Sequence, residues 1–120
     1  MYDDYQPQGE IGTVYLLHLA QPFDHAQHYI GWARDLTGRL KHHKRGTGAA
    51  FLRAVNEAGI EYNVVKTWSG VDRHFERKLK NRRNARLLCP ICQAEKHAHA
   101  MELQRQRRAA RKAAKAARHD

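Results

Sequence analysis

The chain is poor in cysteine and proline and has no long apolar run. Its 120 residues include two cysteines and three prolines, and two cysteines are too few for the disulfide framework of a small secreted domain. No stretch of about 18 apolar residues occurs, and the first ten residues are polar and acidic, unlike a secretory signal. We therefore expect a cytoplasmic protein with no membrane partner.

Acidic residues are also scarce. Twenty-two Lys and Arg stand against twelve Asp and Glu, which gives a formal charge of +10. Hydrophobic residues make up 42% of the chain, enough for one modest core, and the length excludes a large multidomain enzyme. The composition predicts one small domain with a short appendage and a polyanionic partner.

The first part of the chain contains two strand signals. Residues 1–11 lack a hydrophobic period, so we assign them to a flexible leader. Two β-rich runs follow, at 12–19 and 28–32, separated by a loop that contains Pro22 and Asp24. These runs predict two antiparallel strands.

The next part alternates helix and strand signals. Asp35 suits the N-cap of a helix that Gly46 would end. Val71, Phe75 and Leu79 recur at helical spacing after a Ser-x-x-Asp sequence that resembles a capping box. The expected elements are helices at 36–45 and 49–58, a strand at 61–68 and a helix that opens at 69–72, which gives the order ββααβα.

The C-terminal segment, residues 93–120, is rich in Ala, Arg and Lys without Gly or Pro, a composition that favours helix. It carries +5 of the net charge. A solvated or frayed helix is one interpretation, and contact with nucleic acid is the other, because like charges repel unless a polyanion neutralises them. The candidate contacts here are Arg105, Arg107, Arg108, Arg111, Lys112 and Lys115.

An ordered set of motifs spans most of the remaining chain. It comprises Thr13-Val14-Tyr15, then Tyr29-Ile30-Gly31, then an arginine eight residues further on, and a glutamate after the third predicted strand. This set, across residues 12–88, resembles the GIY-YIG nuclease family. The resemblance implies an α+β fold with a three-stranded antiparallel sheet flanked by helices. It also implies an enzyme that cuts double-stranded DNA with one Mg²⁺ or Mn²⁺ ion. The implied catalytic residues are Tyr15, Tyr29, Arg39, His43 and Glu76.

Glu76 is the implied metal ligand. Mg²⁺ commonly binds one or two carboxylates and completes its shell with water and substrate oxygens, so one glutamate can suffice. The alternative is a surface ion pair with Lys80, one helical turn away.

Arg39 and His43 are four residues apart, so a helix places both on one face. There a guanidinium could clamp a phosphate beside an imidazole. Without a catalytic role, Arg39 would be an ordinary surface cation and His43 a half-buried histidine of the helix. Their neighbours Lys41, Lys44 and Arg45 would add positive potential for DNA.

Tyr15 and Tyr29 are ordinary strand aromatics unless the resemblance holds. If it does, Tyr15 is the base or proton relay for the attacking water, and an unperturbed phenol pKa of about 10 must then be lowered. One possible register of the predicted hairpin places Tyr15 directly opposite Tyr29. The family's asparagine is absent, because position 88 is leucine and Asn84 comes about one turn too early.

Cys89 and Cys92 have the C-x-x-C spacing of half a zinc site. His74 or His97 could complete it. A redox motif of the thioredoxin kind and a buried thiol pair are the alternatives.

We therefore expect a metal-dependent DNA endonuclease that hydrolyses phosphodiester bonds with one metal ion and a tyrosine proton relay. Its nuclease domain would be residues 12–92 and its basic helical tail residues 93–120. A noncatalytic DNA-binding protein and a small zinc-containing interaction module are the competing hypotheses.

Overall fold

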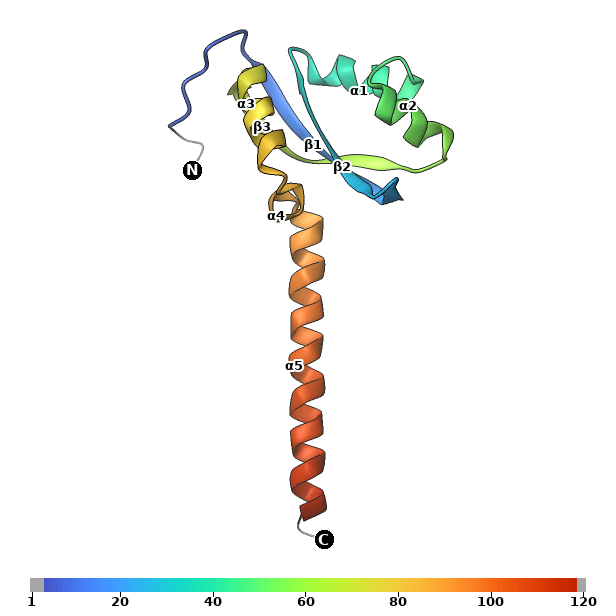
Figure 1. The fold of residues 1–120 in the computed structure, drawn as a ribbon, viewed down its shortest axis with the longest axis vertical. Helices are drawn as coiled ribbons and strands as arrows, with labels where there is room; N and C mark the ends of the chain where they lie inside the picture. Colours follow the sequence, from blue (N-terminus) through green and yellow to red (C-terminus); the bar gives the residue numbers. More distant parts are fainter. Residues whose placement is uncertain (1–3, 119–120) are drawn as a thin grey trace.

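The computed structural model describes residues 4–118, and its fold is α+β, as expected. Three antiparallel strands form one sheet in the order β2-β1-β3. Figure 1 shows the sheet with helices α1 to α4 beside it, and α5 leaving this body as a long rod. The elements are β1 (Gly12–Phe23), β2 (Ala26–Ala33), α1 (Leu36–Arg45), α2 (Ala50–Glu57), β3 (Tyr62–Val71), α3 (Arg73–Arg82), α4 (Ala85–Leu88) and α5 (Pro90–Arg118).

The β1–β2 hairpin is tighter than predicted. β1 runs through Pro22 to Phe23, and the turn consists of Asp24 and His25, whose φ angles are 49° and 71°. The expected loop at Pro22 is therefore wrong. Proline has no backbone N–H to donate to a neighbouring strand. Pro22 is tolerated because the pairing of β1 with β3 ends at Leu19, so β3 offers no acceptor opposite Pro22.

The register of the hairpin is offset from the one that would align the two tyrosines. Tyr15 lies opposite Gly31, and Tyr29 lies opposite Leu17. The pairing shifts between His18 and Phe23, which offsets the strands relative to a simple two-residue hairpin. The arrangement with Tyr15 directly opposite Tyr29 does not occur.

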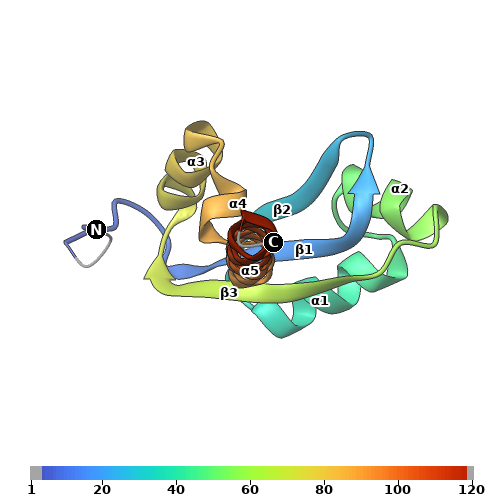
Figure 2. The same cartoon turned by 90° about the horizontal axis from the view of Figure 1, so that it is seen from below.

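The two faces of the sheet bury separate cores, because alternate strand residues point to opposite faces. One core contains Val14 and Leu16 and packs against α3 and the start of α5; the other contains Tyr15 and Leu17 and packs against α1 and α2. Seen along α5 in Figure 2, α3 and α4 lie on one side of β1 and α1 on the other.

The start of α3 differs from the predicted capping box. Ser69 and Val71 still pair with β1, so the helix cannot open there. Asp72 is the N-cap instead, and its Oδ1 accepts a hydrogen bond of 3.0 Å from the backbone N–H of Phe75. This cap satisfies one of the donors that the first helical turn leaves free.

Asp72 also holds the segment that we assigned to a flexible leader. The hydroxyl of Tyr5 and the backbone N–H groups of Gln8 and Gly9 donate to its carboxylate. The Tyr5 bond and then these backbone bonds hold the pKa of Asp72 well below its usual range. Residues 5–9 are therefore attached to the domain, and residues 1–3 lie outside the described part.

Helix α5 begins three residues earlier than the predicted tail, at Pro90, and is described as far as Arg118. At about 1.5 Å per residue its 29 residues extend roughly 43 Å. Every described residue from Ala94 onward is exposed. Among the helices within 4–118, none is both long enough and apolar enough to cross a membrane. Residues 119–120 of the predicted tail lie outside the described chain.

Candidate functional site

A tyrosine and a histidine meet inside the α1–α2 face of the sheet. The hydroxyl oxygen of Tyr15 lies 2.6 Å from Nε2 of His43, and both residues are about 1% exposed. The ring of Tyr29 lies beside both, with centroids 6.2 Å from Tyr15 and 5.6 Å from His43. Three of the five expected catalytic side chains are thus in one group.

Two glycines make room for this group. A Cβ at Gly31 would lie 2.4 Å from the Tyr15 hydroxyl and 2.9 Å from the Tyr29 ring. A Cβ at Gly48 would lie 2.4 Å from Nδ1 of His43. The glycine of the Tyr-Ile-Gly motif therefore has a steric reason, since it faces Tyr15 directly across the hairpin.

The electrostatics keep both partners of the short contact neutral. Burial, Tyr29 and Glu76 raise the pKa of Tyr15, and Arg39 opposes them. Burial and the neighbouring Arg39 lower the pKa of His43. The resting pair is therefore a phenol beside an uncharged imidazole, and Arg39 and Glu76 both lie within electrostatic reach of the phenol.

Glu76 lies on α3, which contacts β2. Its side chain is 21% exposed and its Oε1 forms an ion pair of 3.0 Å with Nζ of Lys80. The pair that we weighed as an alternative is therefore present. No group of three or more ligating side chains forms around Glu76 in the described chain. Glu76 could hold a hard cation only together with water or substrate oxygens as the other ligands.

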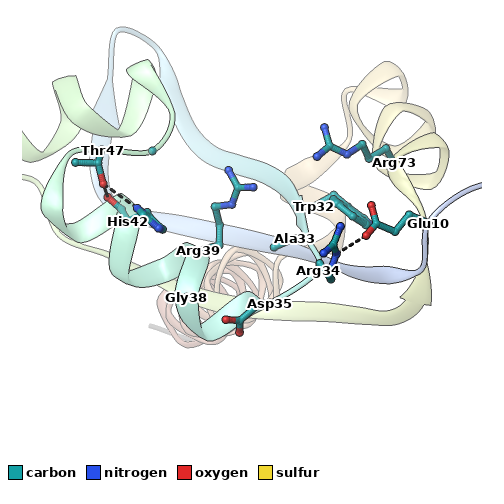
Figure 3. A pocket seen from close by; sticks show the side chains of 11 residues that line it. Glu10, Trp32, Ala33, Arg34, Asp35, Gly38, Arg39, His42, Thr47 and Arg73 are labelled. Atoms are coloured by element: carbon teal, nitrogen blue, oxygen red, sulfur yellow. Dashed lines mark hydrogen bonds and ion pairs between the residues drawn. The ribbon is translucent and has the colours of Figure 1, made fainter.

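A cationic groove opens between α1 and the start of α3 (Figure 3). Its volume is about 520 Å³, and three arginines line it, Arg34, Arg39 and Arg73, together with the acidic Glu10 and Asp35. Arg34 is paired with Glu10, and the guanidinium of Arg73 lies 4.7 Å from the ring centroid of Trp32. Arg73 could not be predicted from the sequence, because a single cation at the start of a helix has no characteristic spacing.

The other cations of α1 lie apart from this groove. Lys41, Lys44 and Arg45 line a separate shallow hollow beside Leu40. Nζ of Lys44 donates to the carbonyl of Tyr62 at 3.3 Å. These three expected DNA contacts therefore do not join the groove of Arg39.

Asn84 and Leu88, the two positions considered for the family's asparagine, have different surroundings. Asn84 is the N-cap of α4 and lines a hollow with Tyr29 and Lys80. Leu88 packs against the core on the α3 side. Asn84 is thus the one of the two that shares a hollow with Tyr29.

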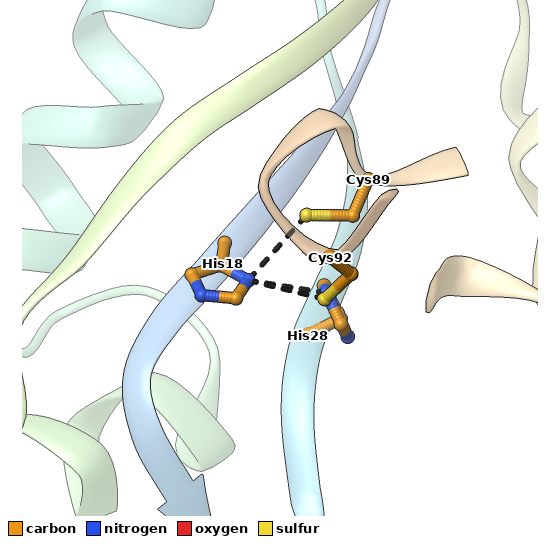
Figure 4. A group of neighbouring side chains, drawn as sticks. All are labelled: His18, His28, Cys89 and Cys92. Atoms are coloured by element: carbon orange, nitrogen blue, oxygen red, sulfur yellow. Dashed lines mark hydrogen bonds between the residues drawn. The ribbon is translucent and has the colours of Figure 1, made fainter. Parts of the chain in front are cut away.

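A second cluster lies on the opposite face of the sheet (Figure 4). His18 of β1 and His28 of β2 form a direct cross-strand pair. Cys89, between α4 and α5, and Cys92, in the first turn of α5, approach them. The four ligating atoms all lie within 4.8 Å of one another, so these residues could hold a metal ion.

The expectation that His74 or His97 completes the cysteine pair is wrong. His97 is exposed on α5, and His74 lines a hollow near Gly9 and Asp72. The cysteines turn toward the sheet instead, where two histidines face each other. A sequence signal existed, since histidines occur on both strands of the hairpin, but only the register shows that they pair.

Comparisons of the chain with models of known families, with curated proteins and with solved structures found no match.

Proposed function

We propose that the protein is a metal-dependent DNA endonuclease of the GIY-YIG kind. The observation that carries the proposal is the 2.6 Å contact between the Tyr15 hydroxyl and Nε2 of His43, with Tyr29, Arg39 and Glu76 around it. A buried hydroxyl needs a hydrogen-bond partner in any case. The contact supports the proposal because both partners are residues to which the resemblance assigns a catalytic role. Phosphodiester hydrolysis needs a proton acceptor, a cation for the phosphoryl charge and a metal ligand. The Tyr15–His43 pair, Arg39 and Glu76 would supply these in turn, and the charges of Arg39 and Glu76 both act on Tyr15.

In this proposal the proton moves through two side chains. When His43 carries its hydrogen on Nδ1, its Nε2 accepts the hydroxyl hydrogen of Tyr15. Tyr15 can then take a proton from the attacking water while it passes its own to His43. A phenol that relays a proton in this way needs no lowered pKa, so the raised pKa of Tyr15 agrees with a relay and disfavours a resting phenolate. Tyr29, which is partly exposed, orients the water or the phosphate.

Arg39 would hold the scissile phosphate. Its side chain projects into the groove of Figure 3 while its charge acts on Tyr15 and His43. A guanidinium can bind two phosphate oxygens at once, which orients the phosphorus as well as neutralising charge. Arg73, across the same groove, would bind a neighbouring phosphate of the strand.

Two different metal sites follow from two donor sets. Glu76 would hold Mg²⁺ or Mn²⁺, which supplies Lewis-acid stabilisation of the phosphoryl oxygens and the leaving oxygen. Lys80 is paired with Oε1 of Glu76, so it must release this oxygen when the cation binds. The His and Cys cluster on the other face suits zinc, because thiolate and imidazole are softer ligands.

The far part of α5 has a form that suits a DNA backbone. At about 100° per residue, the seven cations between Arg105 and Arg118 fall within an arc of about 160°, and the opposite side holds only Ala and Gln. All are exposed. A one-sided row of cations along a straight helix matches a line of phosphates, so we propose double-stranded DNA as its partner.

Cleavage of a supercoiled plasmid with Mg²⁺ or Mn²⁺ tests the function. Wild-type protein should nick or linearise the plasmid, and Glu76→Gln should abolish this without unfolding the domain. Glu57→Gln, an exposed glutamate at the end of α2, is the matched control and should cleave normally. Equal cleavage by Glu76→Gln and wild type would overturn the role of Glu76, and a wild-type protein that binds DNA without cutting it would favour the noncatalytic alternative.

A further inference from the structure

We propose that His18, His28, Cys89 and Cys92 bind one Zn²⁺ ion, which fastens the start of α5 to the β1–β2 hairpin and so fixes the direction of the basic helix. The existence of this site does not depend on the proposed nuclease activity. That the direction of the basic helix matters for DNA binding does rest on the proposed function.

The separations of the four ligand atoms match a tetrahedral zinc site. Zn–N bonds of about 2.0–2.1 Å and Zn–S bonds of about 2.3 Å give edges of about 3.3 Å between two nitrogens and about 3.6 Å between nitrogen and sulfur. His18 Nδ1 lies 3.3 Å from His28 Nε2 and 3.4 Å from Cys89 Sγ. Cys92 Sγ lies 3.8 Å from His18 Nδ1 and 3.4 Å from His28 Nε2. Four of the six separations are thus close to tetrahedral edges, and the two that involve Cys89 with Cys92 and with His28 are within 4.8 Å.

Hydrogen bonding among the four residues does not account for this arrangement. A ring nitrogen has either one hydrogen or one lone pair to offer. Nδ1 of His18 nevertheless lies within 3.8 Å of three polar atoms, from His28, Cys89 and Cys92. A cation at the centre satisfies all of these atoms at once, whereas hydrogen bonds would satisfy one contact and leave the others unmade.

The donor set and its burial select zinc as a structural ion. Two thiolates neutralise the charge of one divalent cation, so the complete site can be buried at low cost. Both cysteines and His18 are buried, and the cysteines are not joined by a disulfide. Four protein ligands leave no open position for water, which distinguishes a structural zinc site from a catalytic one.

The ion would act as the main fastening of α5. Cys92 is the buried residue of this helix within its described length, and Leu87 just before it is 61% exposed. Little apolar surface therefore holds the helix to the domain. His18 and His28 belong to the sheet and Cys92 to the helix, so bonds to a single ion connect the two directly.

Metal analysis of the protein purified without added chelator tests the site. We expect one zinc per chain, and replacement by Co²⁺ should give the visible bands of tetrahedral cobalt together with thiolate charge-transfer absorption. Cys92→Ser and His28→Asn should lose the ion or bind it far more weakly. His97→Asn, which changes an exposed histidine of α5, is the control and should retain it. Protein without bound metal, or a Cys89–Cys92 disulfide under reducing purification, would overturn the proposal.

Amide hydrogen exchange tests whether the bound zinc also fastens the start of α5 to the sheet. After zinc removal and return to buffer with Mg²⁺, amides at 85–95 should exchange faster, while those around Tyr15 and His43 change less. Unchanged exchange at 85–95 would refute the fastening role even if zinc is bound. Because zinc content and exchange need no DNA, a failed cleavage assay leaves this result interpretable. The wild-type cobalt spectrum also remains a test if the ligand variants fail to fold.

Discussion

Replacement of Tyr15 by Phe gives the sharpest test of the proposed relay. The change keeps the buried ring and removes one hydroxyl, which lies 2.6 Å from Nε2 of His43. Within the described chain, Nδ1 of His43 is buried and has no hydrogen-bond partner. The variant therefore leaves both ring nitrogens of a buried histidine unsatisfied, at a cost of about 1–3 kcal/mol. For a domain of this size each kcal/mol lowers Tm by about 4–8 °C.

The effect on cleavage should be larger than the effect on stability. A general base or relay contributes about 10²–10⁴-fold, which corresponds to about 2.7–5.5 kcal/mol of activation free energy. A tyrosine that only packs would change Tm and leave the rate of the folded fraction almost unaltered. Tyr62→Phe is the matched control, because Tyr62 is a second buried tyrosine of the same core and has no contact with His43 among those described.

A double-variant cycle shows whether the two residues act as one unit. Tyr15→Phe, His43→Asn and the combined variant are compared in single-turnover plasmid cleavage well below the lowest Tm of the set. If the proton passes from Tyr15 to His43, either single change interrupts the relay, and the combined variant should be no more than about threefold slower than the slower single variant.

Two results would refute this reasoning. Cleavage by Tyr15→Phe within about threefold of wild type would return Tyr15 to the core as a packing residue. A combined variant whose loss equals the product of the two single losses would show that Tyr15 and His43 contribute independently, whatever their separation in the structure.

Three further predictions concern the groove side and the tail. Gly31→Ala should cost about 1–3 kcal/mol and reduce cleavage, because its Cβ would clash with the Tyr15 hydroxyl; equal Tm by thermal unfolding would contradict this. The pKa of His43 is lowered, so cleavage plotted against pH should lose activity on the acid side with a midpoint below about 6.5. The free energy of unfolding should also fall as the pH drops below about 6.5, because the unfolded chain then binds a proton that the folded chain does not. A cleavage midpoint above about 6.5 would exclude neutral His43 as the proton acceptor. Truncation after Ala94 should weaken DNA binding and flatten log affinity against log salt by about 0.9 per lost phosphate contact; an unchanged slope would leave the tail without this role.

Local signals predicted most of the fold because they act between residues close in sequence. Gly46 ends α1 with a φ of 78°, which a left-handed C-cap requires. Gly59, with a φ of 73°, follows α2 in the same way. Helix propensity alone predicted α5, whose described residues from Ala94 onward make no buried contact.

Features that depend on distant residues could not be predicted in this way. Asp72 became the cap of α3 because β1 pairs with β3 up to Val71 and because Tyr5 reaches the same carboxylate. His18 and His28 lie on the two predicted strands of the hairpin, but only the strand register shows that they pair. Their partners are 71 and 64 residues away in sequence.

Strand β1 connects the two sites because its alternate residues face opposite sides of the sheet. Tyr15 points to the α1–α2 face and His18 to the α3 face, and one register places Tyr15 opposite Gly31 and His18 opposite His28. A slip by one residue would exchange the faces, fill the space that the Tyr15 hydroxyl needs and separate the histidines. An ion bound between His18 and His28 would therefore also oppose a slip at Tyr15. The proposed metal site on one face would in this way protect the geometry of the proposed relay on the other.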